Sequence, residues 1–159
     1  MTATTLDLID RKIVSALMQD ATQPIGRIAD QVGLSQTPCW KRIQKLEAAG
    51  VLTGRVAIAD PAKLGLGLTV FAGVEAPDHS PEWRAGFERA LAAMPEVREV
   101  YRMAGIYDYL LQIIARDVGA FDEFYKRLTT VVKVKSCSSL FVLERLKATP
   151  GYPVDTVTR

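Results

Sequence analysis

The strongest constraint on the fold of this chain is a glycine that separates two helical patterns near the N-terminus. The first helix is predicted over residues 25–32, and Gly33 follows it, where helices commonly end in a left-handed residue. Ser35 is then a good N-cap for a longer helix that runs to about Ala49. A short helix, a tight turn with glycine and a second helix are typical of a helix-turn-helix.

A further helix precedes this pair and completes a three-helix unit. Its apolar residues recur at helical spacing, and it is expected to end between Asp20 and Gln23. Asp7 and Asp10 favour the positive N-terminal end of that helix. The apolar positions are Leu6, Ile9, Ile13 and Leu17, and the candidate N-caps are Thr4 and Thr5.

The longer helix of the pair divides into two faces when its residues are projected on a helical wheel. Cys39, Ile43 and Leu46 gather on one side, which is expected to pack on the other two helices. Trp40 lies at the edge of that side and either anchors the helix or touches the DNA backbone. The opposite side is basic, which fits a DNA major groove. The alternative is an ordinary solvated amphipathic helix, which the preceding helix and glycine turn make less favourable.

The residues predicted to contact double-stranded DNA lie mainly on that basic side. Lysine and arginine suit phosphates, whereas Gln36, Thr37 and Lys41 are placed to meet base edges. Residues 1–59 carry seven Lys or Arg against five Asp or Glu, and the rest of the chain is balanced. This local surplus is what a phosphate-binding surface needs. The full set is Arg27, Ser35, Gln36, Thr37, Lys41, Arg42, Gln44, Lys45 and Arg55.

The second half alternates strand and helix patterns in the order βαββαβ. This order predicts a ferredoxin-like sandwich, in which both helices cover one face of an antiparallel sheet. Large apolar residues occur on both alternations of the strands, so a second copy of the sheet is expected to cover the open face. Strands are predicted over 68–75, 97–104, 107–115 and 134–143, and helices over 81–94 and 118–130.

The fold class is therefore α+β, with an N-terminal winged helix-turn-helix and a C-terminal βαββαβ sandwich. The wing is expected from a short extended piece, Val51 to Arg55, after the third helix. Pro61, Gly65 and Gly67 then mark a hinge without a periodic stripe. The predicted domains are 1–54 for DNA binding, 55–67 as linker, 68–147 for effector binding and assembly, and 148–159 as a C-terminal tail.

Two runs resemble the Lrp/AsnC family of bacterial and archaeal regulators. They are VGLSQTPCWKRIQKLEAAGVLTG (32–54) and GIYDYLLQI (105–113), and the resemblance extends over about residues 5 to 150. It implies a transcription regulator that senses amino acids or related metabolites where C-terminal domains meet. It also implies homodimers that form through the C-terminal sheets and assemble into tetramers or octamers.

The same resemblance implies that the loop with Gly105 and Asp108 lines the effector pocket. Gly105 allows backbone conformations that other residues avoid, and Asp108 can accept hydrogen bonds from an α-ammonium group. The alternative from spacing alone is a plain β-hairpin whose aspartate stabilises its own turn. The candidate effector residues are Gly105, Tyr107, Asp108, Tyr109, Leu110, Ser136 and Ser138.

Other classes of protein find little support in the residues. No membrane span, secretory signal, metal site or cofactor is expected, and the cysteines Cys39 and Cys137 suit a reduced cytoplasm. No catalytic arrangement is evident, so the chain is predicted not to be an enzyme. The alternative is a sirohaem decarboxylase-like enzyme of the same architecture, which would need basic and histidine residues around its pocket. His79 is the one histidine in the chain, in a loop.

Overall fold

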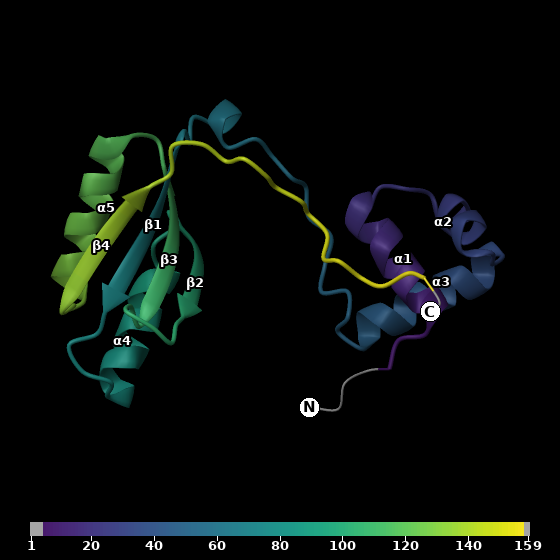
Figure 1. Ribbon diagram of the computed structural model, residues 1–159, viewed down its shortest axis with the longest axis horizontal. Helices are drawn as coiled ribbons and strands as arrows, with labels where there is room; N and C mark the ends of the chain where they lie inside the picture. Colours follow the sequence, from purple (N-terminus) through teal and green to yellow (C-terminus); the bar gives the residue numbers. More distant parts are fainter. Residues whose placement is uncertain (1–4, 158–159) are drawn as a thin grey trace. The chain divides into compact units, whose positions relative to one another are not determined.

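The computed structural model describes residues 5–157 and divides the chain into two compact units (Figure 1). One unit contains residues 5–57 together with residues 146–157, and the other spans Ile58–Arg145. Each unit has its own apolar core. None of the helices within residues 5–157 is long and apolar enough to cross a membrane.

Three helices make up the first unit, and their bounds follow the sequence closely. They are α1 (Leu8–Gln19), α2 (Ile25–Val32) and α3 (Gln36–Ala48). Gly33 ends α2 in the left-handed conformation, with φ of 72°, as predicted. Their core consists of Ile13, Val14, Ala16, Leu17, Ile28, Ala29, Val32, Cys39, Ile43 and Leu46.

The N-cap of α1 differs from the prediction. Asp7 is the cap, and Thr5 lies upstream of it; Thr4 is outside the described residues. The Asp7 side chain accepts a hydrogen bond from the backbone N–H of Asp10, while Asp10 accepts one from the N–H of Asp7, which forms a capping box. Aspartate serves as the cap here because its carboxylate accepts a free backbone N–H and its negative charge also complements the helix dipole.

No wing forms after α3. The extended piece from Val51 to Arg55 contains no strand, and the first strand of the described chain begins at Leu68. A wing needs a ladder of hydrogen bonds between two strands, and this segment has no second strand to pair with. A short 3₁₀ helix, Ala62–Leu64, follows and ends at Gly65, with φ of 73°.

The C-terminal tail belongs to the first unit, although the sequence suggested a segment of its own. The backbone N–H of Tyr152 approaches the Met18 sulfur at 3.5 Å. A Cβ at Gly151 would lie 3.3 Å from the Cβ of Met18, so the backbone of the tail packs closely on that side chain. The tail therefore contacts α1, and the described tail residues contribute to the helix-turn-helix unit.

The second unit is the predicted βαββαβ sandwich. Its strands are β1 (Leu68–Glu75), β2 (Val97–Arg102), β3 (Tyr109–Ala115) and β4 (Ser136–Phe141). Its helices are α4 (Pro81–Ala92) and α5 (Val118–Val131). All neighbouring strands are antiparallel in the order β2-β3-β1-β4, which is visible in Figure 1.

One face of this sheet packs against both helices. Val70, Val74, Leu111 and Ile113 are fully buried there. Residues that alternate with these along β1 and β3 point to the opposite face, and most of them are only half-buried. The helix side adds Phe87, Ala90, Leu91, Met94, Phe121, Phe124 and Leu128 to the core.

The opposite face is apolar but lacks a covering layer within the described residues of the second unit. Phe71 pairs with Leu140 across β1 and β4, and Leu140 is 56% exposed. Leu110 and Ile114 continue this surface on β3. We call Phe71, Leu110, Ile114 and Leu140 the open sheet face.

Gly73 lies among these residues, beneath the ring of Tyr107. A Cβ at Gly73 would meet Tyr107 Cδ2 at 2.4 Å, which no side chain tolerates without a shift. We expect Gly73→Ala to displace the ring and to destabilise the second unit by about 1–3 kcal/mol through overpacking. Urea denaturation followed by circular dichroism measures this change.

Gly105→Ala is the matched control for that experiment. Apart from its neighbours in the chain, no described residue places an atom within 4 Å of a Cβ at position 105, and the φ of Gly105 is not positive. Its stability should stay within about 0.5 kcal/mol of the wild type. Equal stabilities for Gly73→Ala and the wild type would contradict the close packing of Tyr107 on β1.

Candidate DNA interface and effector loop

The two faces of α3 separate as the sequence predicted. Cys39, Ile43 and Leu46 are at most 3% exposed and pack in the core of the three helices. Trp40 is 45% exposed, so it lies at the border of the packed face and does not anchor the helix in the core. The outer side is exposed throughout and consists of Thr37, Lys41, Gln44, Lys45 and Ala48.

The polar side chains at the N-terminus of α3 are exposed to solvent. Ser35 is the N-cap by position, but its hydroxyl makes no capping hydrogen bond and the residue is exposed. Gln36 folds back toward α2, where its Nε2 would lie 2.9 Å from a Cβ at Gly26. Glycine at position 26 therefore lets the Gln36 side chain approach the start of α2.

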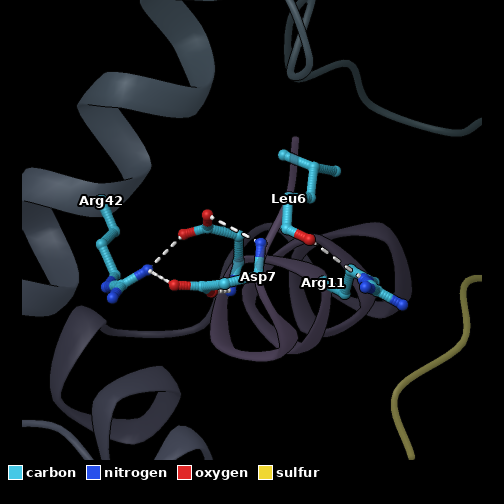
Figure 2. A network of polar contacts seen from close by, with 5 residues as sticks. Leu6, Asp7, Arg11 and Arg42 are labelled. Atoms are coloured by element: carbon cyan, nitrogen blue, oxygen red, sulfur yellow. Dashed lines mark hydrogen bonds and ion pairs between the residues drawn. The ribbon is translucent and has the colours of Figure 1, made fainter. Parts of the chain in front are cut away.

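Arg42 is engaged inside the unit. Figure 2 shows its guanidinium reaching from α3 to two carboxylates at the start of α1. One nitrogen, Nη1, donates to Asp7 Oδ2 at 2.7 Å and to Asp10 Oδ1 at 2.6 Å. Asp10 is buried, Arg42 is 32% exposed in its side chain and Asp7 is 52% exposed. Arg42 was predicted to contact DNA, and its pairing with these two carboxylates was not predicted.

This network shifts the ionisation of Asp7 and Arg42. The pKa of Asp7 is lowered, first because its carboxylate accepts the Asp10 N–H and then because Arg42 bonds to it. The pKa of Arg42 is raised by its bonds to Asp7 and Asp10. The Asp-x-x-Asp spacing at a helix start was the available signal, but only the fold brings Arg42 to it.

The other predicted cations differ in their surroundings. Arg55 pairs with Glu47 at 2.9 Å, with both side chains about half exposed. Arg27 is exposed on α2. Within residues 5–157 no ion pair involves Lys41 or Lys45. These two lysines are therefore the cations of α3 whose charge is not already balanced.

The predicted effector loop connects β2 to β3 and is held by Asp108. Its Oδ2 accepts the N–H of Ala76 at 2.8 Å, and its own N–H donates to the Val74 carbonyl at 3.0 Å. The aspartate thus ties the loop to the end of β1 and does not cap its own turn. The conformational argument for Gly105 was wrong, because Gly105 does not adopt a positive φ.

The seven candidate effector residues do not converge on one face. Tyr109 is buried on the helix side, where its ring lies 4.8 Å from that of Phe87. Ser136 and Ser138 pair with Glu75 and Gly73 of β1, on the same face as Leu110. The Ser136 hydroxyl bonds to Glu75 Oε1 at 2.6 Å. Alternation along a strand sends neighbours to opposite faces, which a one-dimensional motif does not reveal.

A hollow of about 290 Å³ near Asp108 combines Tyr109, a candidate effector residue, with residues that were not predicted to bind the effector. Tyr109 and Trp83 form part of its wall. His79 also lines it, and His79 Nε2 lies 3.9 Å from Asp108 Oδ1. Charged groups of both signs complete the lining, namely Arg84, Glu88 and Arg102. No sequence spacing unites these residues, because they come from α4, β2, β3 and the loop before α4.

The two cysteines are apolar packing residues. Burial raises the pKa of both thiols, so the reactive thiolate is disfavoured. Cys39 is fully buried in the first core, and Cys137 packs beside the second. Among the described residues, no group of three or more His, Cys, Asp or Glu side chains is arranged to hold a metal ion.

A helix-turn-helix with a basic outer face, joined to a separate α/β domain, defines a DNA-binding transcriptional regulator with its own ligand-binding domain. Family models agree: the AsnC-type helix-turn-helix domain matches residues 6–47, and the Lrp/AsnC ligand binding domain matches residues 69–152. The chain belongs to the Lrp/AsnC family of transcriptional regulators.

Known proteins resemble the chain over nearly its whole length. The DNA-binding transcriptional activator DecR of Escherichia coli (strain K12) is 44% identical, covering 94% of this chain and 99% of DecR. An AsnC family regulator from Agrobacterium tumefaciens is 43% identical with a TM-score of 0.89, covering 93% of this chain and 97% of that one. A Neisseria meningitidis regulator, solved with L-methionine, is 32% identical with a TM-score of 0.89 and covers 94% and 97%.

The depressed pKa of Asp7 predicts an acid dependence for the first unit. A carboxyl whose folded pKa lies below its ordinary value of 3.8 stabilises the fold above that value. This contribution is lost as the pH falls from about 4 through the folded pKa. We expect Asp7→Asn to lower the melting temperature at pH 7. The loss in free energy of unfolding should be under about 1 kcal/mol, because the Asp7–Arg42 pair is partly exposed to solvent. The difference should vanish near pH 2 in thermal melts.

Asp30→Asn is the matched control, since it makes the same change of charge at an exposed position of α2. Its melting temperature should follow that of the wild type at every pH. An Asp7→Asn difference that stays constant from pH 7 to pH 2 would show that the carboxylate charge contributes nothing.

Proposed function

We propose that the chain binds double-stranded DNA through the outer face of α3. The observation that carries this proposal is the exposure of Lys41 and Lys45, which form no ion pair in the described chain. Both lysines face outward because the inner face of α3 is buried. Side chains of this kind on a helix suit the major groove and its phosphates. Ser35, Gln36, Thr37 and Gln44 supply hydrogen-bonding groups beside them, and Arg27 supplies a further cation.

Arg55 and Arg42, which were also predicted to contact DNA, contribute less to this proposal because both already form ion pairs. Arg55 is paired with Glu47, and an exposed pair of that kind exchanges partners at little cost. Arg42 is neutralised within the unit by Asp7 and Asp10. A regulator of this kind works where the chromosome is, so we place the protein in the cytoplasm.

We further propose that the open sheet face is covered by a second copy of the chain. Apolar side chains that the unit leaves partly or largely exposed, such as Phe71 and Leu140, favour burial against a similar surface. A two-fold dimer presents two α3 helices to successive major grooves, which suits near-palindromic sites about one helical turn apart. Further association of dimers into tetramers or octamers is part of the same proposal.

The effector is proposed to be an amino acid or a related metabolite, bound in the second unit. The match to an Lrp/AsnC ligand binding domain and the L-methionine in the Neisseria regulator support it. An amino acid needs an anionic partner for its ammonium group and a cationic one for its carboxylate. Asp108, Glu88, Arg84 and Arg102 offer both signs around the loop and the adjoining hollow.

We propose that the protein has no catalytic activity. The sirohaem decarboxylase alternative receives no support, because the family is one of transcriptional regulators and the His79 side chain is a 74% exposed loop residue. The effector acts by binding one assembly of subunits better than another, and that difference in affinity sets its influence on DNA binding.

DNA binding through α3 is tested with Lys41→Ala/Lys45→Ala in a gel-shift salt series. The probe is a duplex that the wild-type protein selects from a random-sequence library. We expect the double variant to bind at least about tenfold more weakly. The slope of log affinity against log salt should become shallower by about 0.9 for each phosphate that the protein no longer neutralises. Adding each of the common L-amino acids to the wild type tests the effector.

The matched control is Lys126→Ala/Lys133→Ala, which removes two exposed lysines from the second unit. It should bind the selected duplex as the wild type does. Failure of the folded wild type to bind DNA at low salt, with or without amino acids, would contradict the DNA-binding proposal. Binding that no amino acid alters would contradict the effector proposal alone.

The dimer is tested with Leu140→Glu. A charge placed in a sheet-to-sheet interface is deprived of its hydration without a partner, so we expect this variant to sediment with the mass of a single chain. Val131→Glu makes the same kind of change at the end of α5, where Val131 is 66% exposed, and should leave the mass unaltered. Equal masses for Leu140→Glu and the wild type would place the interface elsewhere.

A further inference from the structure

The bridge between α3 and α1 is a polar group in which every carboxylate oxygen has a partner. All four oxygens of Asp7 and Asp10 are used: two accept the reciprocal backbone N–H groups and two accept Arg42 Nη1. Arg42 lies 32 and 35 residues away from these carboxylates in sequence. The bridge therefore joins two elements that the sequence separates (Figure 2).

This bridge supplies something that the apolar core does not. Cys39, Ile43 and Leu46 hold α3 against its neighbours, but apolar burial has no preferred direction. Charged hydrogen bonds are directional, and a single nitrogen bonded to two fixed oxygens allows little rotation. The apolar core decides which side of α3 faces outward, and the bridge adds a directional restraint on the rotation of the helix about its own axis.

The charges also argue against a phosphate contact by Arg42. One positive charge faces two carboxylates, so the cluster as a whole is not cationic. A phosphate approaching Arg42 would meet the negative charges of Asp7 and Asp10 as well. Lys41, one residue earlier on α3, takes part in no ion pair of the described chain.

We propose that Arg42 is a positioning residue for DNA recognition, and that its bridge to Asp7 and Asp10 fixes the rotation of α3. This inference rests on the proposed DNA binding through α3. Arg42 acts through Thr37, Lys41 and Lys45, whose placement in the groove depends on that rotation. Sequence-specific binding requires the correct rotation, whereas binding to random DNA depends mainly on total charge.

Asp10→Asn gives the sharpest test, because the two explanations predict opposite signs. Removing a negative charge from a DNA-binding unit strengthens DNA binding if charge alone matters. If the bridge positions α3, Asp10→Asn weakens binding to the selected duplex by about tenfold and leaves binding to a random duplex equal or stronger. Asp30→Asn, with the same charge change on α2 and outside the bridge, should bind both duplexes at least as well as the wild type.

Arg42→Met/Asp10→Asn tests the other end of the bridge without leaving a buried carboxylate unpaired, which protects folding. We expect a melting temperature near that of Asp10→Asn, an affinity for the selected duplex reduced by about tenfold, and an unchanged salt slope. Lys45→Ala provides the contrast, since removing a cation that neutralises one phosphate makes the slope shallower by about 0.9.

Three results would overturn the proposal. If the salt slope becomes shallower in the double variant as it does in Lys45→Ala, Arg42 is a phosphate-binding residue and not a positioning residue. If both bridge variants bind the selected duplex with wild-type affinity below their melting temperatures, the bridge stabilises the fold but does not position α3 for DNA binding. A wild-type protein that selects no duplex would overturn this inference together with DNA binding itself.

Discussion

The packing of α3 on α1 and α2 is the interaction on which the DNA-binding unit depends. Cys39, Ile43 and Leu46 are almost completely buried, and their burial forces the opposite side of the same helix into solvent. Lys41 and Lys45 are exposed because of that packing and not because of any ion pair of their own. A helix without its apolar side would have no reason to hold its lysines in one direction.

In the second unit, packing on one face of the sheet likewise leaves the other face partly exposed. Two helices cover one face of the sheet, and Val70, Val74, Leu111 and Ile113 fill that core. The other face keeps apolar side chains but has no covering layer within the described residues of the unit. Tyr107 covers part of it by lying on Gly73, where any side chain would collide with the ring. The effector loop is therefore joined to β1 in two ways, through Tyr107 packing and through the Asp108 hydrogen bonds.

Charge has two distinct uses in the first unit. Lys41 and Lys45 face outward from α3, whereas Arg42 is neutralised by Asp7 and Asp10 within the unit. Adjacent basic residues in the sequence, Lys41 and Arg42, thus serve different purposes. Their difference arises from about 100° of rotation along the helix, which brings one side chain to solvent and the other to the start of α1.

Local patterns in the chain were enough to establish its elements: three helices with Gly33 at the turn, the βαββαβ order and the inward side of α3 are all as predicted. These follow from periodicity and from the backbone freedom of glycine, which act over a few residues. Four features came only from the folded chain, namely the Arg42 bridge, the position of Tyr109 away from Ser136 and Ser138, the tail against α1 and the missing wing strand. Each of these depends on residues far apart in the chain or on a pairing partner, and a linear pattern carries no distance between such residues.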